Sequence, residues 1–101
     1  MFIKIKKLLG FKTVDISALI KNGATVLDVR TPQEFSQGHL PGSHNIPLQN
    51  IAKQLKKIEA MPQPIITCCA SGIRSGRARR ILKKAGLEVY NVGAWTSIKQ
   101  S

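Results

Sequence analysis

Two cysteines stand side by side in the stretch IITCCASGIRSGRAR, residues 65–79, and the 101-residue chain holds no others. A cysteine thiolate is a strong nucleophile, so this stretch is the first candidate for chemistry. Four residues separate Cys69 from Arg74, and five separate Cys68 from the same arginine. The tighter spacing suits a loop that holds one sulfur atom, whereas the wider spacing leaves room for a tetrahedral phosphate or arsenate centre. The spacing alone leaves open which cysteine reacts.

The residues after the cysteines are suited to stabilising an anion. A strand that ends in a tight turn and a helix amino terminus presents unpaired backbone N–H groups and the positive end of the helix dipole. Such a site lowers the pKa of a thiol and binds a small anionic substrate. Gly72 permits the curvature, Arg74 adds a forked donor for an oxyanion, and Ser75 either caps the helix or binds substrate. The plain alternative is a pair of core thiols followed by solvated arginines.

Alternating helical patterns and short apolar runs must position this loop, and they predict an α/β fold with a mostly parallel sheet. Thr31, Pro32 and Glu34 form a capping box that begins one helix. Because side chains alternate along a strand, Cys68 is expected on the opposite side of its strand from Cys69, as a packed thiol. The expected order begins with a helix after Asp15, a strand at 25–29, a helix from Thr31 to Gly38 and a short strand at 45–46. A helix that includes 51–58 and a strand at 65–69 follow. The last two elements are a helix that buries Ala78, Ile81, Leu82 and Ala85, and a strand at 89–92.

Length and charge limit the possible roles of the chain. One domain is expected, and 16 Lys or Arg against 5 Asp or Glu give a net charge of +11, which attracts anions of any kind. Two adjacent cysteines do not make a disulfide framework, so we expect a reducing compartment, the cytoplasm. Residues 1–11, MFIKIKKLLGF, are too short for a secretory signal or a membrane span and are interpreted as a basic amphipathic arm, with peripheral membrane contact as one role.

Two motifs in order resemble a known family. LDVRTPQEFSQGHLPGSHNIPL, residues 27–48, followed by CASGIRS, residues 69–75, is similar to the single-domain rhodaneses, which are thiosulfate-type sulfurtransferases. The resemblance implies a rhodanese-like α/β domain at 12–101, with a small, mostly parallel central sheet and helices on both faces. It also implies sulfur transfer from thiosulfate or a similar anionic donor to a thiol, cyanide or a protein cysteine through a Cys69 persulfide.

The resemblance also assigns residue roles. The family places a glycine three residues and an arginine five residues after its catalytic cysteine, and Gly72 and Arg74 satisfy both counts only from Cys69. The position after the nucleophile is often arginine in the family but is Ala70 here, which removes one substrate-facing charge. The implied substrate-binding residues are Ala70, Ser71, Gly72, Ile73, Arg74 and Ser75. The resemblance also makes His39 structural. Asp28 and Arg30 lie at a strand end beside the loop and are expected to support it structurally. No cofactor is expected, and no metal site is expected either, because two histidines and two adjacent cysteines match no ligand spacing.

Three other functions stay open at this point. The domain is alternatively a non-catalytic interaction module or a relay that carries a persulfide to a dedicated partner. A phosphatase or arsenate reductase acting through Cys68 is a further alternative, although Thr67 and Ser71 do not match the histidine and glycine of the usual phosphatase loop. Nucleic-acid binding has only the charge in its favour, because basic and aromatic residues are not interleaved. We expect a monomer.

Overall fold

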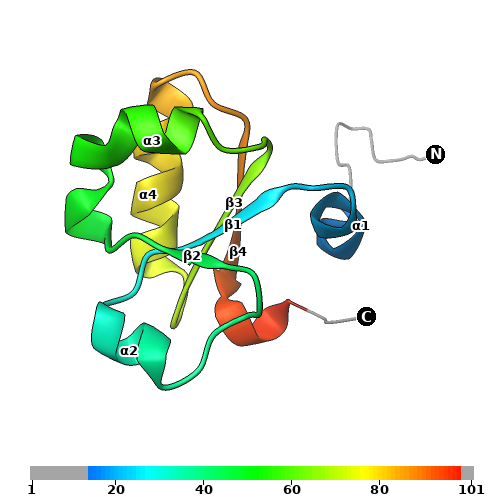
Figure 1. Cartoon of the computed structure of the whole chain (residues 1–101), viewed down its shortest axis with the longest axis vertical. Coiled ribbons are helices and arrows are strands. Elements are labelled where there is room, and N and C mark those ends of the chain that lie inside the picture. The colour runs from blue at the N-terminus through cyan, green and yellow to red at the C-terminus, as the bar shows by residue number, and fades with distance from the viewer. Residues whose placement is uncertain (1–13, 99–101) are drawn as a thin grey trace.

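Four parallel strands form the centre of the computed structural model, which describes residues 14–98 (Figure 1). Their order in the sheet is β2-β1-β3-β4, so β3 lies between β1 and β4. The strands are β1 Thr25–Asp28, β2 His44–Asn45, β3 Ile65–Cys69 and β4 Val89–Ala94. Parallel strands bring their carboxyl ends to one edge of the sheet, where α/β folds bind their ligands.

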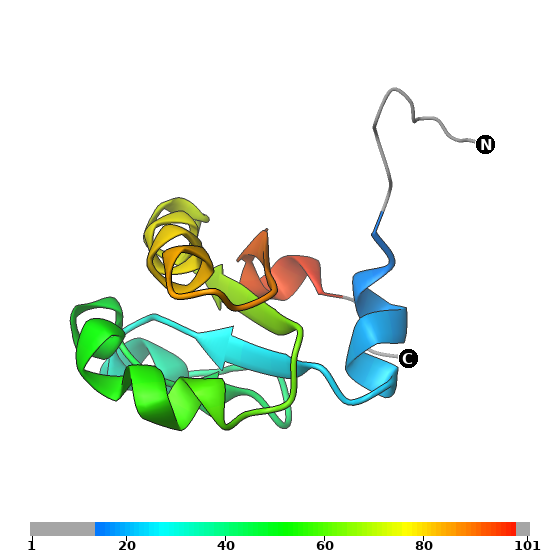
Figure 2. The same ribbon diagram turned by 90° about the horizontal axis from the view of Figure 1, so that it is seen from above.

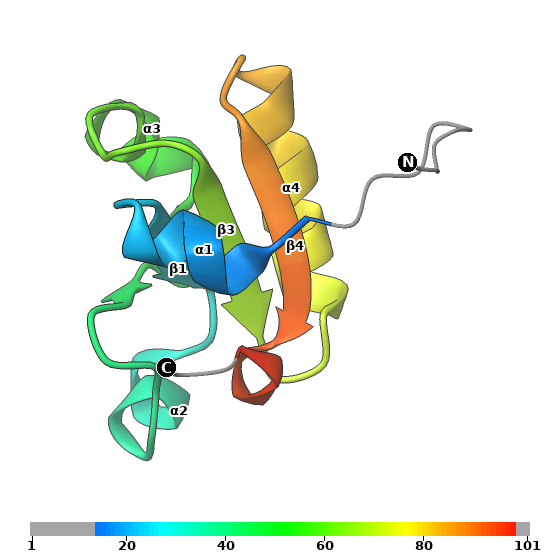
Figure 3. The same cartoon turned by 90° about the vertical axis from the view of Figure 1, so that its right-hand side faces the viewer.

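Helices cover both faces of the sheet (Figure 2). The helices α3 (Leu55–Glu59) and α4 (Ile73–Lys84) pack on one face, and α1 (Ile16–Lys21) lies on the other. In Figure 3 the strands β3 and β4 run to the same end of the molecule, where α2 (Pro32–Ser36) and the short 3-10 helix η3 (Trp95–Ser97) lie. The expected α/β architecture, with a parallel sheet between two helical layers, is confirmed.

The sheet separates two apolar clusters. Leu27 and Cys69 belong to the larger cluster, beneath α3 and α4, while Val26, Ile66 and Cys68 belong to the smaller one, beneath α1 and η3. Every residue of β1 and β3 is buried, as expected for strands covered on both faces. Alternation along β3 therefore sends the two neighbouring cysteines into different clusters, which confirms the expected orientation of Cys68.

Local sequence signals define most element ends. The side chain of Asp15 accepts a hydrogen bond from the N–H of Ala18 and caps α1. Thr31 and Glu34 form the expected capping box at the start of α2, with Pro32 at its first position. The β2 strand occupies residues 44–45 rather than 45–46, and β4 continues two residues past its expected end, to Ala94.

Two helical expectations need correction. The segment expected as one helix around residues 51–58 consists of 3-10 turns at Leu48–Asn50 and Ala52–Gln54 followed by α3. Gln54 leaves the helical region, at φ −109° and ψ 19°, and therefore separates the second turn from α3. Ala85, expected on the buried face of α4, is exposed because it lies beyond the last helical residue.

The basic arm predicted at residues 1–11 lies outside the described residues. Over residues 14–98, the structure contains no helix with the length and apolar character needed to cross a bilayer.

Candidate active site

The end of β3 places Cys69 at the carboxyl edge of the sheet. Cys68 lies opposite Gly93 of β4, and Cys69 lies opposite Ala94. The register between β3 and β4 shifts between Thr67 and Cys68, so the end of β4 carries one residue more than β3. The chain then turns sharply through residues 70–72 into α4, which begins only four residues after Cys69.

Two glycines allow this turn to lie close to β4. Gly72 has φ +108°, and a Cβ atom added to it would approach the Cα of Gly93 to 3.1 Å. Gly93 itself has φ +82°. A side chain at position 72 would therefore be strained by its backbone conformation and would also push against the β4 backbone. The loop is consequently held against β4, with the N–H of Gly72 directed at the Cys69 sulfur.

The Cys69 sulfur is surrounded by hydrogen-bond donors. The N–H of Gly72 lies 2.9 Å from Sγ, and the N–H of Ser75 lies 3.4 Å from it. The hydroxyl of Ser75 is 3.3 Å from the same sulfur. Ser75 is fully buried within α4, and its hydroxyl faces the thiol. Of the two roles expected for Ser75, the helix cap is wrong, because Gly72 occupies the cap position.

The two thiols differ in pKa because only Cys69 has these donors. Burial by itself raises the pKa of Cys69, but the Ser75 side chain and the backbone N–H groups of Ser75, Gly72 and Ser71 outweigh it and lower the pKa below its ordinary value. Cys68 has no such donors: burial, together with the nearby Asp28 carboxylate, raises its pKa to about 12. Cys69 is therefore the thiol that ionises more readily.

Arg74 is held by a carboxylate that our sequence analysis assigned only to a helix cap. Its two terminal nitrogens donate to the two Glu34 carboxylate oxygens, at 2.7 and 3.0 Å. Glu34 in turn accepts from the backbone N–H and the hydroxyl of Thr31. The Arg74 hydrogen bonds, aided by the Thr31 N–H, lower the pKa of Glu34 to about 2. Part of the fork expected to face an oxyanion thus binds a protein carboxylate instead.

A sequence signal for this contact did exist. Glu34 lies in the first turn of the helix that follows β1, Arg74 lies in the first turn of the helix that follows β3, and these two strands are neighbours. Because parallel strands end at one edge, opposite charges at both positions are expected to meet.

Asp28 ends β1, and Arg30 follows it by two residues. Arg30 forms a buried ion pair with Asp28, with 2.8 Å between Nη2 and Oδ2. The same guanidinium donates to the carbonyl groups of Gly38 and Glu34, at 2.7 and 3.3 Å, and lies 4.8 Å from the ring of Trp95. The guanidinium thereby holds Glu34 within α2 and Gly38 just after it, and Asp28 itself lies opposite Cys68 in the sheet.

His39 lies further out. Its Nδ1 is 2.7 Å from the carbonyl oxygen of Phe35, and the two rings are stacked with centroids 3.6 Å apart. These contacts are local to the end of α2, and His39 is exposed. Its place in the structure supports the segment that carries Glu34 rather than the cysteine loop itself.

The remaining loop residues form the outer rim. Ala70 and Ser71 are exposed, and Ile73 is 69% exposed, whereas the Cys69 side chain is fully buried. These three rim residues carry no charge, and the next residue, Arg74, is paired with Glu34.

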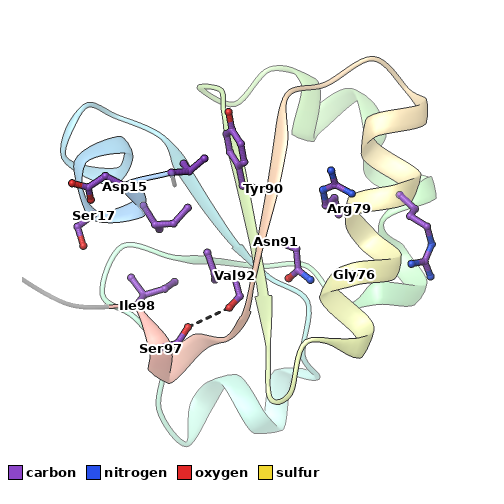
Figure 4. A pocket seen from close by; sticks show the side chains of 12 residues that line it. Asp15, Ser17, Gly76, Arg79, Tyr90, Asn91, Val92, Ser97 and Ile98 are labelled. Carbon is purple, nitrogen blue, oxygen red and sulfur yellow. Dashed lines mark hydrogen bonds between the residues drawn. The ribbon is translucent and has the colours of Figure 1, made fainter. Parts of the chain in front are cut away.

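A separate hollow of roughly 1140 Å³ lies beside the outer edge of β4, between α1 and α4 (Figure 4). Gly76, Arg79, Tyr90 and Asn91 line it, and the cysteines do not. Between residues 14 and 98, no cluster of three or more histidine, cysteine or acidic side chains is arranged to hold a metal ion. The hydrogen-bond donors around Cys69, and not this wider hollow, mark the candidate active site.

Comparison with known proteins identifies the fold and its relatives. Residues 13–101 match the family model for the rhodanese-like domain. The chain belongs to the rhodanese family. The sequence resemblance to single-domain rhodaneses is thereby confirmed, and a rhodanese-type sulfurtransferase domain is supported.

Relatives and solved structures agree with this assignment. The chain is 33% identical to thiosulfate sulfurtransferase GlpE of Pseudoalteromonas translucida over 95 residues, covering 88% of this chain and 90% of that protein. It is 43% identical over 70 residues to the uncharacterised protein YqhL of Bacillus subtilis, covering 68% of this chain but only 55% of YqhL. The human single-domain sulfurtransferase TSTD1 superposes with a TM-score of 0.70 at 25% identity, over 90% of this chain and all of its own.

Proposed function

We propose that the chain moves a sulfane sulfur from thiosulfate, or a similar anionic donor, to a thiophilic acceptor through a persulfide on Cys69. The single observation that carries the proposal is the set of donors around the Cys69 sulfur, led by the 2.9 Å contact from the Gly72 N–H. Such donors favour the thiolate, which is the reactive form of cysteine.

In the first step, the Cys69 thiolate attacks the outer sulfur of thiosulfate. A bond forms between Sγ and that sulfur, the bond between the two thiosulfate sulfurs breaks, and sulfite leaves with the electron pair. The product is an anionic persulfide on Cys69. The N–H groups of Ser71, Gly72 and Ser75 stabilise negative charge at the sulfur before and after this step.

In the second step, an acceptor thiolate or cyanide attacks the terminal sulfur, and the Cys69 thiolate is the leaving group. The acceptor gains one sulfur atom and the enzyme returns to its starting state. The two half-reactions share one covalent intermediate, so ping-pong kinetics are expected. Acceptors of this class are a small thiol, a protein cysteine or, in an assay, cyanide.

A relay to a dedicated partner is the second candidate, and one observation favours it. The Arg74 fork binds Glu34 at 2.7 and 3.0 Å, and position 70 is alanine, so the loop offers a small dianion little unpaired charge. A putative sulfur carrier protein of Bacillus subtilis, YrkF, is 38% identical over 68 residues, although the chain covers only 36% of it. A relay would load slowly from thiosulfate and exchange sulfur readily with a protein.

The phosphatase alternative through Cys68 receives no support from the geometry. Cys68 is fully buried on the opposite face of β3 from the loop donors, among the apolar residues beneath α1. The raised pKa of its thiol also disfavours the thiolate that a nucleophile requires.

Intact-protein mass spectrometry after thiosulfate treatment tests the proposal. The wild type is expected to gain the mass of one sulfur, which reductant or cyanide removes. Cys69→Ser should gain none, whereas the matched variant Cys68→Ala should load as the wild type does. Loading that survives in Cys69→Ser but is lost in Cys68→Ala would refute the assignment.

Both cysteines are free thiols, which fits a reducing compartment, and we place the protein in the cytoplasm as a monomer. Size-exclusion chromatography coupled to light scattering tests the oligomeric state, and a molar mass well above that of one 101-residue chain would contradict it.

A further inference from the structure

The helix that begins at the active-site loop carries an uncompensated positive charge. Residues Ile73–Lys84 of α4 contain six Arg or Lys and no acidic residue. Arg74 is paired with Glu34, but within residues 14–98 no carboxylate lies within 4.0 Å of the other five cations. These are Arg77, Arg79, Arg80, Lys83 and Lys84.

Helix geometry aligns part of this charge in one row. At 3.6 residues per turn, positions 73, 77, 80 and 84 lie on one side of α4, opposite the buried residues 75, 78 and 82. All four are exposed. We call this row the outer stripe: Ile73, Arg77, Arg80 and Lys84.

The stability of the helix does not account for the outer stripe. Arg77 and Arg80 are three residues apart, and Arg80 and Lys84 are four apart, so each pair places like charges beside one another. Because these contacts destabilise the isolated helix, the row of cations calls for a compensating anionic partner.

The stripe connects directly to the reactive loop. Ile73 is 69% exposed and lies in the turn region that follows Cys69, just after the exposed, uncharged residues Ala70 and Ser71. An aliphatic side chain exposed to this degree beside a reactive centre is suited to contact an apolar group on a partner. Beyond Ile73, the charged residues of the outer stripe continue along the helix. A partner would therefore make apolar contacts with Ile73 and electrostatic contacts with the cations on one continuous surface.

The length of the stripe fits a macromolecule rather than a small donor. Lys84 lies eleven positions after Ile73, which corresponds to about 16 Å along the helix axis. Of the cations in α4, Arg74 is the closest to the loop in sequence, and its guanidinium is already bound to Glu34. A small dianion at Cys69 would therefore engage little of this charge, whereas a protein surface can span all of it.

The chemistry of the surface favours a protein over RNA. Single-stranded RNA binding uses exposed aromatic rings for base stacking. Phe35, Tyr90 and Trp95 are all partly buried, and the exposed large apolar side chains among residues 14–98 are the aliphatic Val14 and Ile73.

We propose that the outer stripe docks an acidic protein whose cysteine takes the sulfane sulfur from Cys69; this rests on the proposed function. The partner thiolate attacks the terminal sulfur of the Cys69 persulfide. A sulfur–sulfur bond forms on the partner, the bond to Cys69 Sγ breaks, and Cys69 leaves as the thiolate. Acidic groups on the partner pair with Arg77, Arg80 and Lys84, and an apolar group beside its cysteine contacts Ile73.

The test uses the full chain and two synthetic acceptor peptides. Each contains one cysteine and one neighbouring leucine; one peptide is rich in glutamate, and the other carries lysine at the same positions. The protein is first loaded with sulfur by thiosulfate, freed of excess donor and confirmed by mass. Sulfur transfer to each peptide, and to the neutral thiol dithiothreitol, is then followed by mass spectrometry.

Charge reversal provides the decisive comparison. Arg77→Glu with Arg80→Glu is expected to slow transfer to the glutamate peptide about tenfold at low salt and to leave dithiothreitol unaffected. The matched control, Lys56→Glu with Lys57→Glu, makes the same charge change on exposed positions of α3 and should alter the rate less than twofold. The difference should shrink as salt is added.

Three outcomes would overturn the proposal. Equal slowing by both double variants would show only an effect of net charge. No slowing by the α4 variant would show that the stripe takes no part. Salt-sensitive binding of a single-stranded RNA oligonucleotide, lost in the α4 variant while peptide transfer is unchanged, would assign the stripe to RNA. Failure of Cys69 to load at all would instead refute the proposed function, so the two failures are distinguishable.

Discussion

Cys68 and Cys69 are adjacent in sequence, end the same strand and are both fully buried, yet they occupy opposite chemical environments. Cys69 faces a turn whose N–H groups and Ser75 hydroxyl lower its pKa. Cys68 faces apolar side chains, and burial beside Asp28 raises its pKa to about 12. Burial alone therefore does not decide the reactivity of a thiol; the donors that replace water do.

The comparison also shows what the loop contributes. Both sulfurs lose solvent contact, which penalises their thiolates. Only the Cys69 thiolate is stabilised in return, by backbone N–H groups that the strand-to-helix turn leaves without helical partners. Preorganised donors of this kind need no rearrangement when charge develops, which is how a small domain can support covalent chemistry.

The largest expected effect is a difference in alkylation. With a pKa of about 12, Cys68 holds about one thiolate in 10⁵ thiols at pH 7. Iodoacetamide at neutral pH should therefore label Cys69 at least about 100-fold faster than Cys68, as read by peptide mapping. Because the pKa of Cys69 is lowered, its labelling rate should rise with pH and level off at a lower pH than that of an unperturbed cysteine. Equal labelling of both cysteines in the folded protein would contradict the comparison.

Removing one hydrogen-bond donor should raise the pKa of Cys69 toward that of Cys68. Gly72→Ala introduces a Cβ at φ +108°, 3.1 Å from the Gly93 Cα, so the backbone there is strained and crowded, and we expect the Gly72 N–H to shift away from the sulfur. We expect sulfur transfer to fall on the order of 100-fold, similar to the loss of one oxyanion-hole donor. The measurement is the thiosulfate:cyanide rate.

Gly86→Ala is the matched control for that prediction. Gly86 also has a positive φ, +93°, but a Cβ there would meet nothing within 4 Å. The variant should lose some stability from backbone strain and keep its transfer rate. A similar loss of rate in both variants would mean that strain, and not the Gly72 donor, controls Cys69.

Much of this arrangement was predictable from the sequence, for identifiable reasons. Capping residues and alternating apolar runs marked α1, α2 and the buried strands, since these signals are local. The placement of Cys68 and Cys69 on opposite faces followed from the two-residue period of a strand. The family resemblance was confirmed because two motifs in order are specific.

Contacts between distant segments were harder to foresee. The sequence assigned Glu34 to a helix cap, and its bond with Arg74 joins residues 40 positions apart. Ser75 was expected either to cap a helix or to bind substrate, but α4 begins at Ile73, so Ser75 lies inside the helix beside the sulfur. The close approach of Gly72 to Gly93 occurs where the register of β4 shifts, beyond the expected end of that strand at residue 92.

A smaller effect is expected from the Ser75 hydroxyl. Ser75→Ala removes one of the donors to Cys69 but keeps the backbone N–H at 3.4 Å. The pKa of Cys69 should rise and the transfer rate at neutral pH should fall about tenfold, in line with the loss of one hydrogen bond to a charged group. Ser36→Ala, which removes an exposed hydroxyl that donates to Gln33, should change neither quantity.

The rate of the Ser75 variant should recover as pH is raised, because more of its Cys69 becomes thiolate. Recovery would show that the hydroxyl acts through ionisation of the thiol. A deficit that stays constant with pH would point to a role in binding the donor instead.

The smallest effect is expected at Glu34, which touches neither sulfur. Its pKa is lowered to about 2 by Arg74 and Thr31, from an ordinary value of 4.5. A carboxylate with a depressed folded-state pKa adds stability above pH 4.5, and that stability is lost as pH falls toward 2. Glu34→Gln removes the charge, so the wild type should show a modestly higher urea midpoint at pH 6, and this advantage should shrink by pH 2.5.

The Thr31 contacts that cap α2 can partly survive in the Glu34→Gln variant, which isolates the ion pair with Arg74. Glu59→Gln is the control, since Glu59 is exposed on α3, away from the loop, and its urea midpoint should track the wild type at both pH values. An unchanged midpoint in Glu34→Gln at pH 6 would mean that this pair orients Arg74 without stabilising the fold. The alkylation rate of Cys69 in the same variant would then show whether the orientation of Arg74 affects the sulfur. A change of more than about threefold would mean that the Arg74 charge influences the ionisation of Cys69.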